Sequence, residues 1–308
     1  MNSILSKTKI GSQPGGRPPA AVELSPDGAL AAAIPGPAQA PVYAFQPLPA
    51  GALVPGIGEP NFRNPEAVAA AIRSALSQVS PRTRAVTLVI PDTTVRVFVL
   101  DFDSLPAKPA EVYPVLRFRL RKMVPFDVEH AGLSYQILAQ SKSECRVLAA
   151  VIPGPILAEY EAAVRNAGYE PGAVLSSSLA ALQAGASSES MEAILAANLS
   201  PIALTTSITN GQDLMLYRTL DLPEDPELRL QEVQRGIAVA AAYFEDKLGA
   251  RPSGLYYAGI GSASEFADYL DDPELTVIDR MPPPESGFVT PIGDASIAGV
   301  AGALAGAS

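Results

Sequence analysis

The tripeptide Gly259-Ile260-Gly261 is the place where residue types and spacing come nearest to a chemical site. It follows an expected strand and precedes an expected helix, so its backbone N–H groups are placed to face an anion such as phosphate. The third glycine of a dinucleotide-binding loop is missing, and no GxxxxGK[ST] phosphate loop occurs in the chain. Alone, the turn indicates a weak anion site at most, and most such glycines serve only the turn.

Nucleophilic and metal chemistry have few candidate residues. The glycine turn does not match the GxSxG nucleophile elbow. His130 and Cys145 are the single histidine and the single cysteine, which excludes a His/Cys zinc cluster and an internal disulfide. A Ser-His-Asp triad would have to use His130, which we interpret as a structural or surface residue. We therefore expect no catalytic residue and no metal ligand.

Composition excludes several functional classes. The chain has 308 residues, of which 48% are hydrophobic, so a substantial core is expected. The net charge of −10 argues against nonspecific electrostatic binding to nucleic acid or to anionic lipid. No window approaches the about 18–20 strongly apolar residues of a membrane span, and the N-terminus lacks a secretory signal. The basic run Arg117–Lys122 is either a solvated face or a docking surface for an acidic or membrane-proximal partner.

Periodic apolar residues and turn signals predict an α/β chain. Helix starts are marked by Asn64-Pro65 and Asp225-Pro226, because Asn and Asp cap helices and Pro fits the first helical position. Hairpins are expected around Ser25-Pro26-Asp27-Gly28 and around Asn210-Gly211. Asp294 is expected to cap a final Ala/Gly-rich helix.

Hairpin-led segments near residues 20–48 and 200–220 begin two halves, which suggests a duplicated α/β architecture with a cleft between them. Residues 85–152 are interpreted as a compact unit of strand, strand, helix, strand and strand. The expected division is a flexible leader (1–19), a first half (20–84 and 153–190) interrupted by the inserted unit (85–152), a second half (191–285), and a C-terminal helix returning to the first half (286–308).

Residues 89–138 resemble PilM, the actin-like protein of type IV pilus assembly. The resemblance rests on Arg96 near the start of a strand, Leu105-Pro106, Glu111 ahead of a helix, Pro125-Phe126, and Tyr135 in the next strand. It continues more loosely to the C-terminal helix and covers most of the chain after residue 20. It implies an α/β actin-like (ribonuclease H-like) fold of two halves, the first carrying a small inserted α+β subdomain.

The resemblance also places an ATP site, and the sequence departs from the family pattern there. Actin-like ATPases use two Asp-x-Gly turns, which here correspond to Glu23-Leu24-Ser25 and Asn198-Leu199-Ser200. One carboxylate and both glycines are lost, and Pro26 and Pro201 remove an N–H after each turn. The expected degenerate nucleotide site consists of Glu23, Ser25, Asn198, Ser200, Gly259 and Gly261. We expect no cofactor, the alternative being weak binding of ATP with magnesium.

The resemblance implies a cytoplasmic protein, peripheral at the inner membrane, that binds the N-terminal tail of a PilN-like membrane protein and contacts other platform or motor proteins. The leading hypothesis is a non-catalytic scaffold that binds an extended peptide. The alternatives are a nucleotide-binding actin-like ATPase of pilus assembly and the cytoplasmic component of a type II secretion platform. The latter normally continues into a membrane helix, and the end of this sequence at Ser308 favours the pilus hypothesis.

Overall fold

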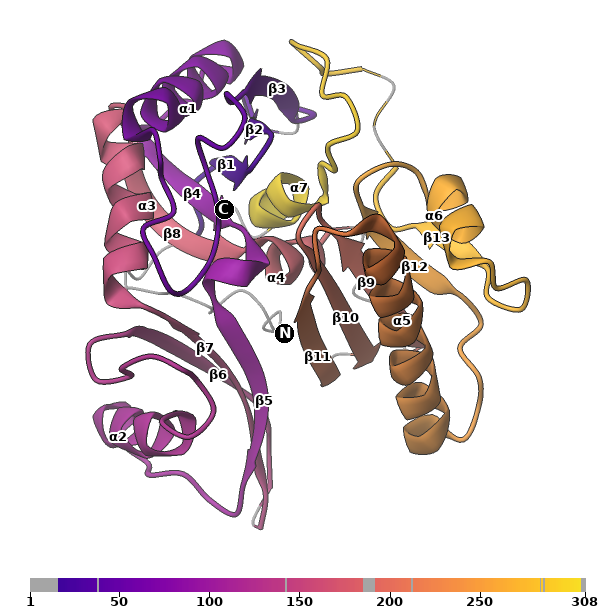
Figure 1. Ribbon diagram of the computed structural model, residues 1–308. Coiled ribbons are helices and arrows are strands. Elements are labelled where there is room, and N and C mark those ends of the chain that lie inside the picture. Colours follow the sequence, from indigo (N-terminus) through magenta and orange to yellow (C-terminus); the bar gives the residue numbers. More distant parts are fainter. Residues whose placement is uncertain are drawn as a thin grey trace.

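Two five-stranded sheets form the two halves of the molecule (Figure 1). The computed structural model describes residues 16–37, 39–141, 143–184, 192–211, 213–282, 284 and 286–305. The first half contains β1 (Ala20–Ser25), β2 (Gly28–Ala33), β3 (Val42–Pro47), α1 (Pro65–Val79), β4 (Ala85–Ile90), the short 3₁₀ helix η1 (Asp92–Thr94), α3 (Gly154–Asn166), β8 (Glu170–Ser176) and α4 (Ser177–Ala181). The second half contains β9 (Ala193–Leu199), β10 (Ala203–Asn210), β11 (Asp213–Asp221), α5 (Pro226–Leu248), β12 (Leu255–Gly259), α6 (Ala263–Leu270) and β13 (Val277–Asp279).

The two sheets repeat one topology. Their strand orders are β3-β2-β1-β4-β8 and β11-β10-β9-β12-β13. In each sheet the three strands that come first in the sequence form an antiparallel meander. The remaining two strands lie parallel to the first strand of that meander. The duplicated α/β architecture expected from the sequence is therefore present, and equivalent positions in the two halves can be compared directly.

The inserted subdomain is a three-stranded antiparallel sheet with one helix on it. It contains β5 (Arg96–Phe102), α2 (Pro109–Leu120), β6 (Gly132–Gln140) and β7 (Cys145–Ile152), in the strand order β5-β7-β6. Its other face packs on the second half, where Leu148 meets Leu214 and Tyr217. Arg96 joins the same contact, because its guanidinium forms an ion pair with Asp221 of β11 at 3.0 Å.

Local signals explain the helix boundaries. The Asn64 side chain accepts a hydrogen bond from Ala67 N at 3.0 Å at the start of α1, and Asp225 accepts from two backbone amides at the start of α5. Ser262 and Glu265 form a reciprocal capping box on α6. Gly249 ends α5 with a φ of 69°, in the left-handed region that glycine adopts without strain.

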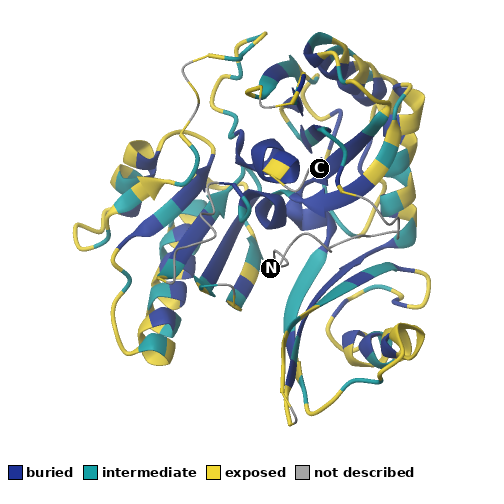
Figure 2. Ribbon diagram, turned by 180° about the vertical axis from the view of Figure 1, so that it is seen from behind, coloured by how far each residue is buried: buried dark blue, intermediate teal, exposed yellow. Residues whose placement is uncertain are grey.

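A layer of two helices is shared by the halves. α1 and α3 cover the outer face of the first sheet, α5 and α6 that of the second, and α4 lies with α7 (Ala298–Ala305) between the sheets (Figures 1 and 2). α4 and α7 touch so closely that a Cβ at Gly302 would overlap the carbonyl oxygen of Ala180. Arg280 of the second half donates to the carbonyl of Ala181, at 3.1 Å, and to that of Leu182.

Four expectations need correction. β4 belongs to the large first sheet, so the insertion comprises 96–152 rather than 85–152. The second half begins with β9, and the expected hairpin at 200–220 supplies its second and third strands. α7 begins at Ala298, whose amide donates to Ser296 Oγ, so Asp294 does not cap it. Residues 1–15 of the expected leader lie outside the described residues, but Arg17 is packed and donates to Gln183 Oε1 at 2.7 Å.

Candidate functional site

A cleft between the halves brings the expected turns together. Its cavity of about 700 Å³ is lined by Asp27 and Phe45 of the first half, Ser200 and Gly261 of the second, and residues 292–295. Asp27 belongs to the β1–β2 turn that contains Ser25, and Gly259 lines an adjoining cavity of about 390 Å³. Three segments far apart in the sequence thus border one cleft.

The β1–β2 turn satisfies its own backbone. Ser25 Oγ accepts hydrogen bonds from the amides of Asp27 and Gly28, at 3.3 and 3.2 Å. Pro26, between them, has no N–H. Each turn amide that follows Ser25 is therefore absent or engaged with the serine hydroxyl, in the manner of a serine turn.

The β9–β10 turn repeats this arrangement. Ser200 Oγ accepts from the amides of Ile202 and Ala203, at 3.4 and 3.0 Å, and Pro201 occupies the place of Pro26. Register confirms that the positions are equivalent, since Ser25 lies opposite Gly28 and the Ser200 amide donates to the Ala203 carbonyl. Both halves thus close the same turn with the same side chain.

The backbone amides of the glycine turn are also engaged in hydrogen bonds within the protein. Ile260 N donates to the Leu199 carbonyl at 3.0 Å, Gly261 N to the Asp294 carbonyl at 3.2 Å, and Ser262 N to the carboxylate of Glu265 at 2.7 Å. A Cβ on Gly259 would come within 2.6 Å of the Leu199 carbonyl oxygen. Close packing of β12 on β9 is thus sufficient to require glycine at position 259.

The Glu23 side chain is buried against α4 and α7 and does not line either cavity of the cleft. Its Oε1 accepts a hydrogen bond from Ser177 Oγ at 2.5 Å, and its carboxylate lies against Gly299 in the first turn of α7. Oε2 is inaccessible to solvent. Burial raises the Glu23 pKa to about 7, and the Ser177 hydrogen bond and the Val300 amide partly oppose that rise. Glu23 thus links β1 to α4 and α7.

Asn198 does not reach the cavities of the cleft either. It lies within β9, opposite Thr205 of β10 and beside Ala258 of β12, two residues before the turn. The six predicted site residues therefore separate into two groups. Ser200, Gly259 and Gly261 line the cleft, whereas Glu23, Ser25 and Asn198 are not among its lining residues.

A second buried carboxylate was not predicted. Asp92 accepts from Ser178 N at 3.1 Å and Ser178 Oγ at 2.5 Å, and Tyr217 Oη donates to it from the second half at 3.4 Å. Burial raises its pKa, and the Ser178 hydrogen bonds oppose that rise. The run Ser176-Ser177-Ser178 at a strand–helix junction was the available signal, but the partner carboxylates lie far away in the sequence.

The segment 286–297 crosses the cleft. It pairs with the edge of the first sheet, where Tyr43 exchanges backbone hydrogen bonds of 2.8 Å with Gly287 and Val289. Farther along, the Asp294 carbonyl accepts from Gly261 of the second half. Residues 292–295 line both cavities, so the chain itself divides the cleft. Within the described residues, no group of three His, Cys, Asp or Glu side chains is placed to hold a metal ion.

Neither a family model nor a curated protein matches the chain. Among solved structures, a chain of the PilM-PilN type IV pilus biogenesis complex superposes with a TM-score of 0.72 at 20% identity, covering 93% of this chain and 96% of that chain. The chain has an actin-like fold. The cytoplasmic domain of EpsL, an inner membrane component of the type II secretion system of Vibrio cholerae, gives a TM-score of 0.51 at 12% identity, covering 93% of this chain and 92% of that chain.

The superposition covers nearly the whole of each chain, so the matched chain of that complex has counterparts of both halves and of the inserted subdomain. None of this chain's helices within the described residues is both long and apolar enough to cross a membrane.

Proposed function

We propose that this chain is a non-catalytic scaffold of a type IV pilus inner-membrane platform, which binds the cytoplasmic N-terminal tail of a PilN-like membrane protein. The observation that carries the proposal is the end-to-end superposition on a chain of the PilM-PilN complex, at a TM-score of 0.72. The type II secretion component EpsL supports a second candidate, the cytoplasmic part of a secretion platform, at the lower TM-score of 0.51.

The cleft supports a non-catalytic role. An actin-like ATPase needs free backbone amides at two turns and a carboxylate beside the metal, because phosphate and Mg²⁺ carry the charge of the site. Here serine hydroxyls engage the amides of both turns, and Glu23 points to α7. These residues do not fit a magnesium–triphosphate complex, so the proposal includes no nucleotide-dependent step.

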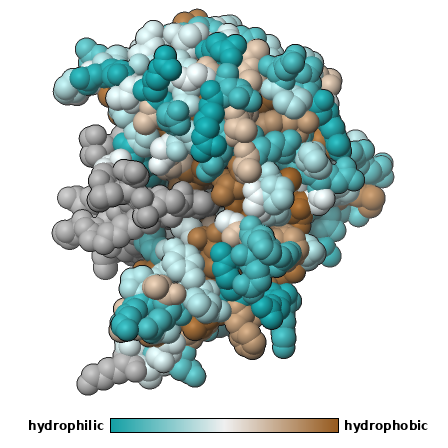
Figure 3. Space-filling view, turned by 90° about the vertical axis from the view of Figure 1, so that its left-hand side faces the viewer, coloured by the Kyte–Doolittle hydropathy of each residue, from teal (hydrophilic) through white to brown (hydrophobic). Residues whose placement is uncertain are grey.

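The junction between the first half and the insertion is the proposed docking face for the tail. Figure 3 shows hydrophobic atoms gathered midway down this side of the molecule. α3 starts there, with Leu157 so close to Gly132 of β6 that a Cβ on the glycine would lie 2.8 Å from the leucine methyl. An extended peptide with alternating apolar residues fits such a surface.

The loop 48–64 borders this junction and is held on α3. The carboxylate of Glu159 accepts from the amides of Asn61 and Phe62, both at 2.8 Å, and Tyr160 Oη donates to Asn61 Oδ1 at 3.1 Å. Val54 in this loop is 48% exposed. Because the loop is fixed before the partner arrives, binding does not require that it be ordered.

The test is calorimetric titration with a synthetic peptide that has the sequence of the cytoplasmic N-terminal tail of a PilN-like protein from the same organism. We expect Val54→Asp to weaken tail binding at least about tenfold, because a charge would be buried against apolar side chains. Val239→Asp on α5, at a residue that is 47% exposed, is the matched control and should bind as the native chain does. Failure of the native chain to bind the tail, or equal losses in both variants, would refute the proposed function.

A further inference from the structure

The outer face of α2 presents a basic and aromatic patch. The helix buries Val112, Leu116 and Leu120 against the inserted sheet. On the opposite side Phe118 is 72% exposed, and Met123 just beyond the helix is 41% exposed. Arg119 and Lys122 lie beside them, and the ion pairs among the described residues engage neither. Isolated exposed Leu or Phe residues are common, but a nearly bare Phe between unpaired cations indicates a contact surface.

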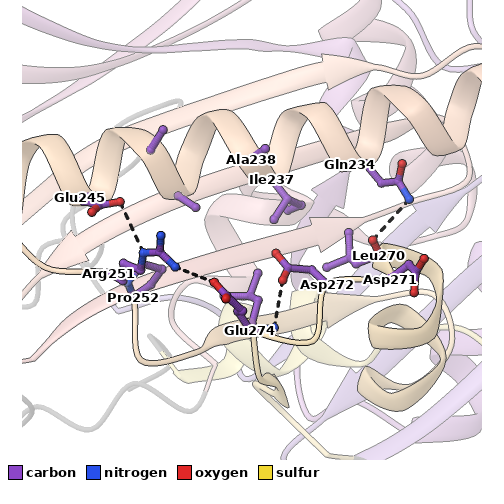
Figure 4. Close-up of a pocket in the computed structure, with 13 residues that line it drawn as sticks. Gln234, Ile237, Ala238, Glu245, Arg251, Pro252, Leu270, Asp271, Asp272 and Glu274 are labelled. Atoms are coloured by element: carbon purple, nitrogen blue, oxygen red, sulfur yellow. Dashed lines mark hydrogen bonds and ion pairs between the residues drawn. The ribbon is translucent and has the colours of Figure 1, made fainter.

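A groove with the opposite character lies on the second half. It runs between α5 and the chain after α6 and encloses about 710 Å³ (Figure 4). Its apolar lining includes Ile237, Ala238, Ala241 and Leu270. The alanines recur at helical spacing along α5, which leaves room for side chains of another element. Its volume lies within the range of clefts that bury a small ligand or several side chains.

The rim of the groove is acidic. Glu245, Asp271, Asp272 and Glu274 surround it, together with Arg251. Arg251 pairs with Glu245 and Glu274, at 3.9 and 2.6 Å, and so neutralises part of that charge (Figure 4). Asp271 and Asp272 take part in no ion pair among the described residues. Two unpaired carboxylates thus stand beside an apolar floor, and two unpaired cations stand beside exposed Phe118 and Met123.

The patch and the groove lie on opposite sides of the molecule, with α2 at the lower left of Figure 1 and α5 and α6 at its right. A contact between them must therefore join two copies. We propose that the α2 patch of one copy docks into the α5–α6 groove of another, with Phe118 and Met123 on the apolar floor and Arg119 and Lys122 facing Asp271 and Asp272.

Such a contact is heterologous, because each copy contributes a different surface. Every copy keeps a free patch or groove after pairing, so assembly proceeds beyond a dimer into a chain or a closed ring. An anionic lipid surface would use the α2 patch alone and leave the groove without an occupant, whereas a second copy accounts for both surfaces. This inference stands apart from the proposed tail binding, which uses the junction beside α3.

The test uses two single variants in the full chain, with sedimentation velocity over a range of concentrations. Phe118→Glu changes the patch, and Ala238→Arg fills the groove with a cation at an exposed helical position. The matched controls are Ile137→Glu, on the same subdomain at a residue that is 42% exposed, and Val239→Arg, the neighbouring residue on α5, outside the groove lining.

The native chain and both controls should form species larger than dimers as concentration rises, less so in high salt, because the paired charges are screened. Each test variant alone should remain monomeric. An equimolar mixture of the two should form dimers and nothing larger, because one variant keeps an intact groove and the other an intact patch.

Three results would overturn the inference. The native chain stays monomeric at every concentration; both variants assemble as the native chain does; or the mixture forms no dimer. A parallel flotation assay with phosphatidylglycerol vesicles detects the competing occupant. If the native chain is monomeric and binds these vesicles, and Phe118→Glu alone abolishes that binding, the patch serves lipid and the proposed self-contact is wrong.

Discussion

Ser25 and Ser200 occupy equivalent places in the two halves, and each closes its hairpin turn by accepting hydrogen bonds from the second and third following amides. Each is followed by proline, which removes the remaining N–H of the turn. The two halves therefore share this arrangement although their sequences around the turns differ. The cleft between the halves is consequently bordered by two turns whose amides are hydrogen-bonded to a serine within the same turn. This engagement of the amides is one basis of the proposed scaffold role.

The first prediction concerns these two serines. Ser25→Ala and Ser200→Ala should each lower the free energy of unfolding by about 1 kcal/mol, because each leaves two turn amides without their acceptor. The measurement is urea denaturation, with exposed Ser253→Ala as the control. A lower free energy of unfolding in one of these variants and not in the other would show that the two turns do not contribute equally to stability.

The second prediction concerns the contact of α4 with α7. Gly302→Ala should destabilise the protein by about 1–3 kcal/mol, because the added methyl group overlaps the Ala180 carbonyl and forces the two helices apart. Gly58→Ala, where an added Cβ has no neighbour within 4 Å, is the control. Thermal unfolding of both variants measures the difference, and equal melting temperatures would contradict the close helix contact.

The third prediction is a pH dependence set by Glu23. Its pKa is raised from 4.5 to about 7 in the folded chain, chiefly by burial, so the folded state prefers the protonated form. The contribution of Glu23 to the free energy of unfolding is complete below pH 4.5 and is lost as the pH rises through about 7. The reason is that the Glu23 carboxyl group ionises at a lower pH in the unfolded chain than in the folded chain. The loss is on the order of 3 kcal/mol at pH 8.

Glu23→Gln isolates this contribution, because the amide oxygen can still accept from Ser177 but cannot ionise. The variant should be more stable than the native chain at pH 8, and the advantage should shrink toward pH 5. Denaturant unfolding at both pH values gives the comparison. A difference that is the same at the two pH values would exclude a buried, neutral-preferring Glu23.

The fourth prediction concerns the hydrogen bond between the halves. A double-mutant cycle of Asp92→Asn and Tyr217→Phe should give a coupling of about 0.5–1.5 kcal/mol, because the tyrosine hydroxyl donates to the carboxylate at 3.4 Å. Pairing Asp92→Asn with Tyr160→Phe should be additive, since Tyr160 bonds to Asn61. A coupling near zero in the first cycle would mean that this contact does not join the halves.

The sequence predicted those features whose cause is local. Asn64 and Asp225 determine where two helices begin through their own side chains, and both act as expected. Asn210-Gly211 marks the β10–β11 hairpin for the same reason, with Gly211 at a φ of 58°. The resemblance to PilM added the two-half fold, which the similarity of structure supports.

Features set by distant segments could not be predicted. The apolar pattern of β4 indicates a strand but not its partners. β4 pairs with β1 and β8 and not with β5, because β8 returns to the first sheet after the insertion. Glu23 lies close to α7, about 275 residues later, and that helix decides where its carboxylate points. Asp92 and Tyr217 likewise come together only when the two halves pack.

The most direct test of the scaffold account is titration of the nucleotide-free chain with the PilN-like tail, repeated with Mg-ATP present, beside a titration with Mg-ATP alone. The account predicts the same dissociation constant for the tail in both buffers and no measurable heat from nucleotide. Micromolar Mg-ATP binding that disappears in Asn198→Ala, or tail binding that requires Mg-ATP, would contradict it.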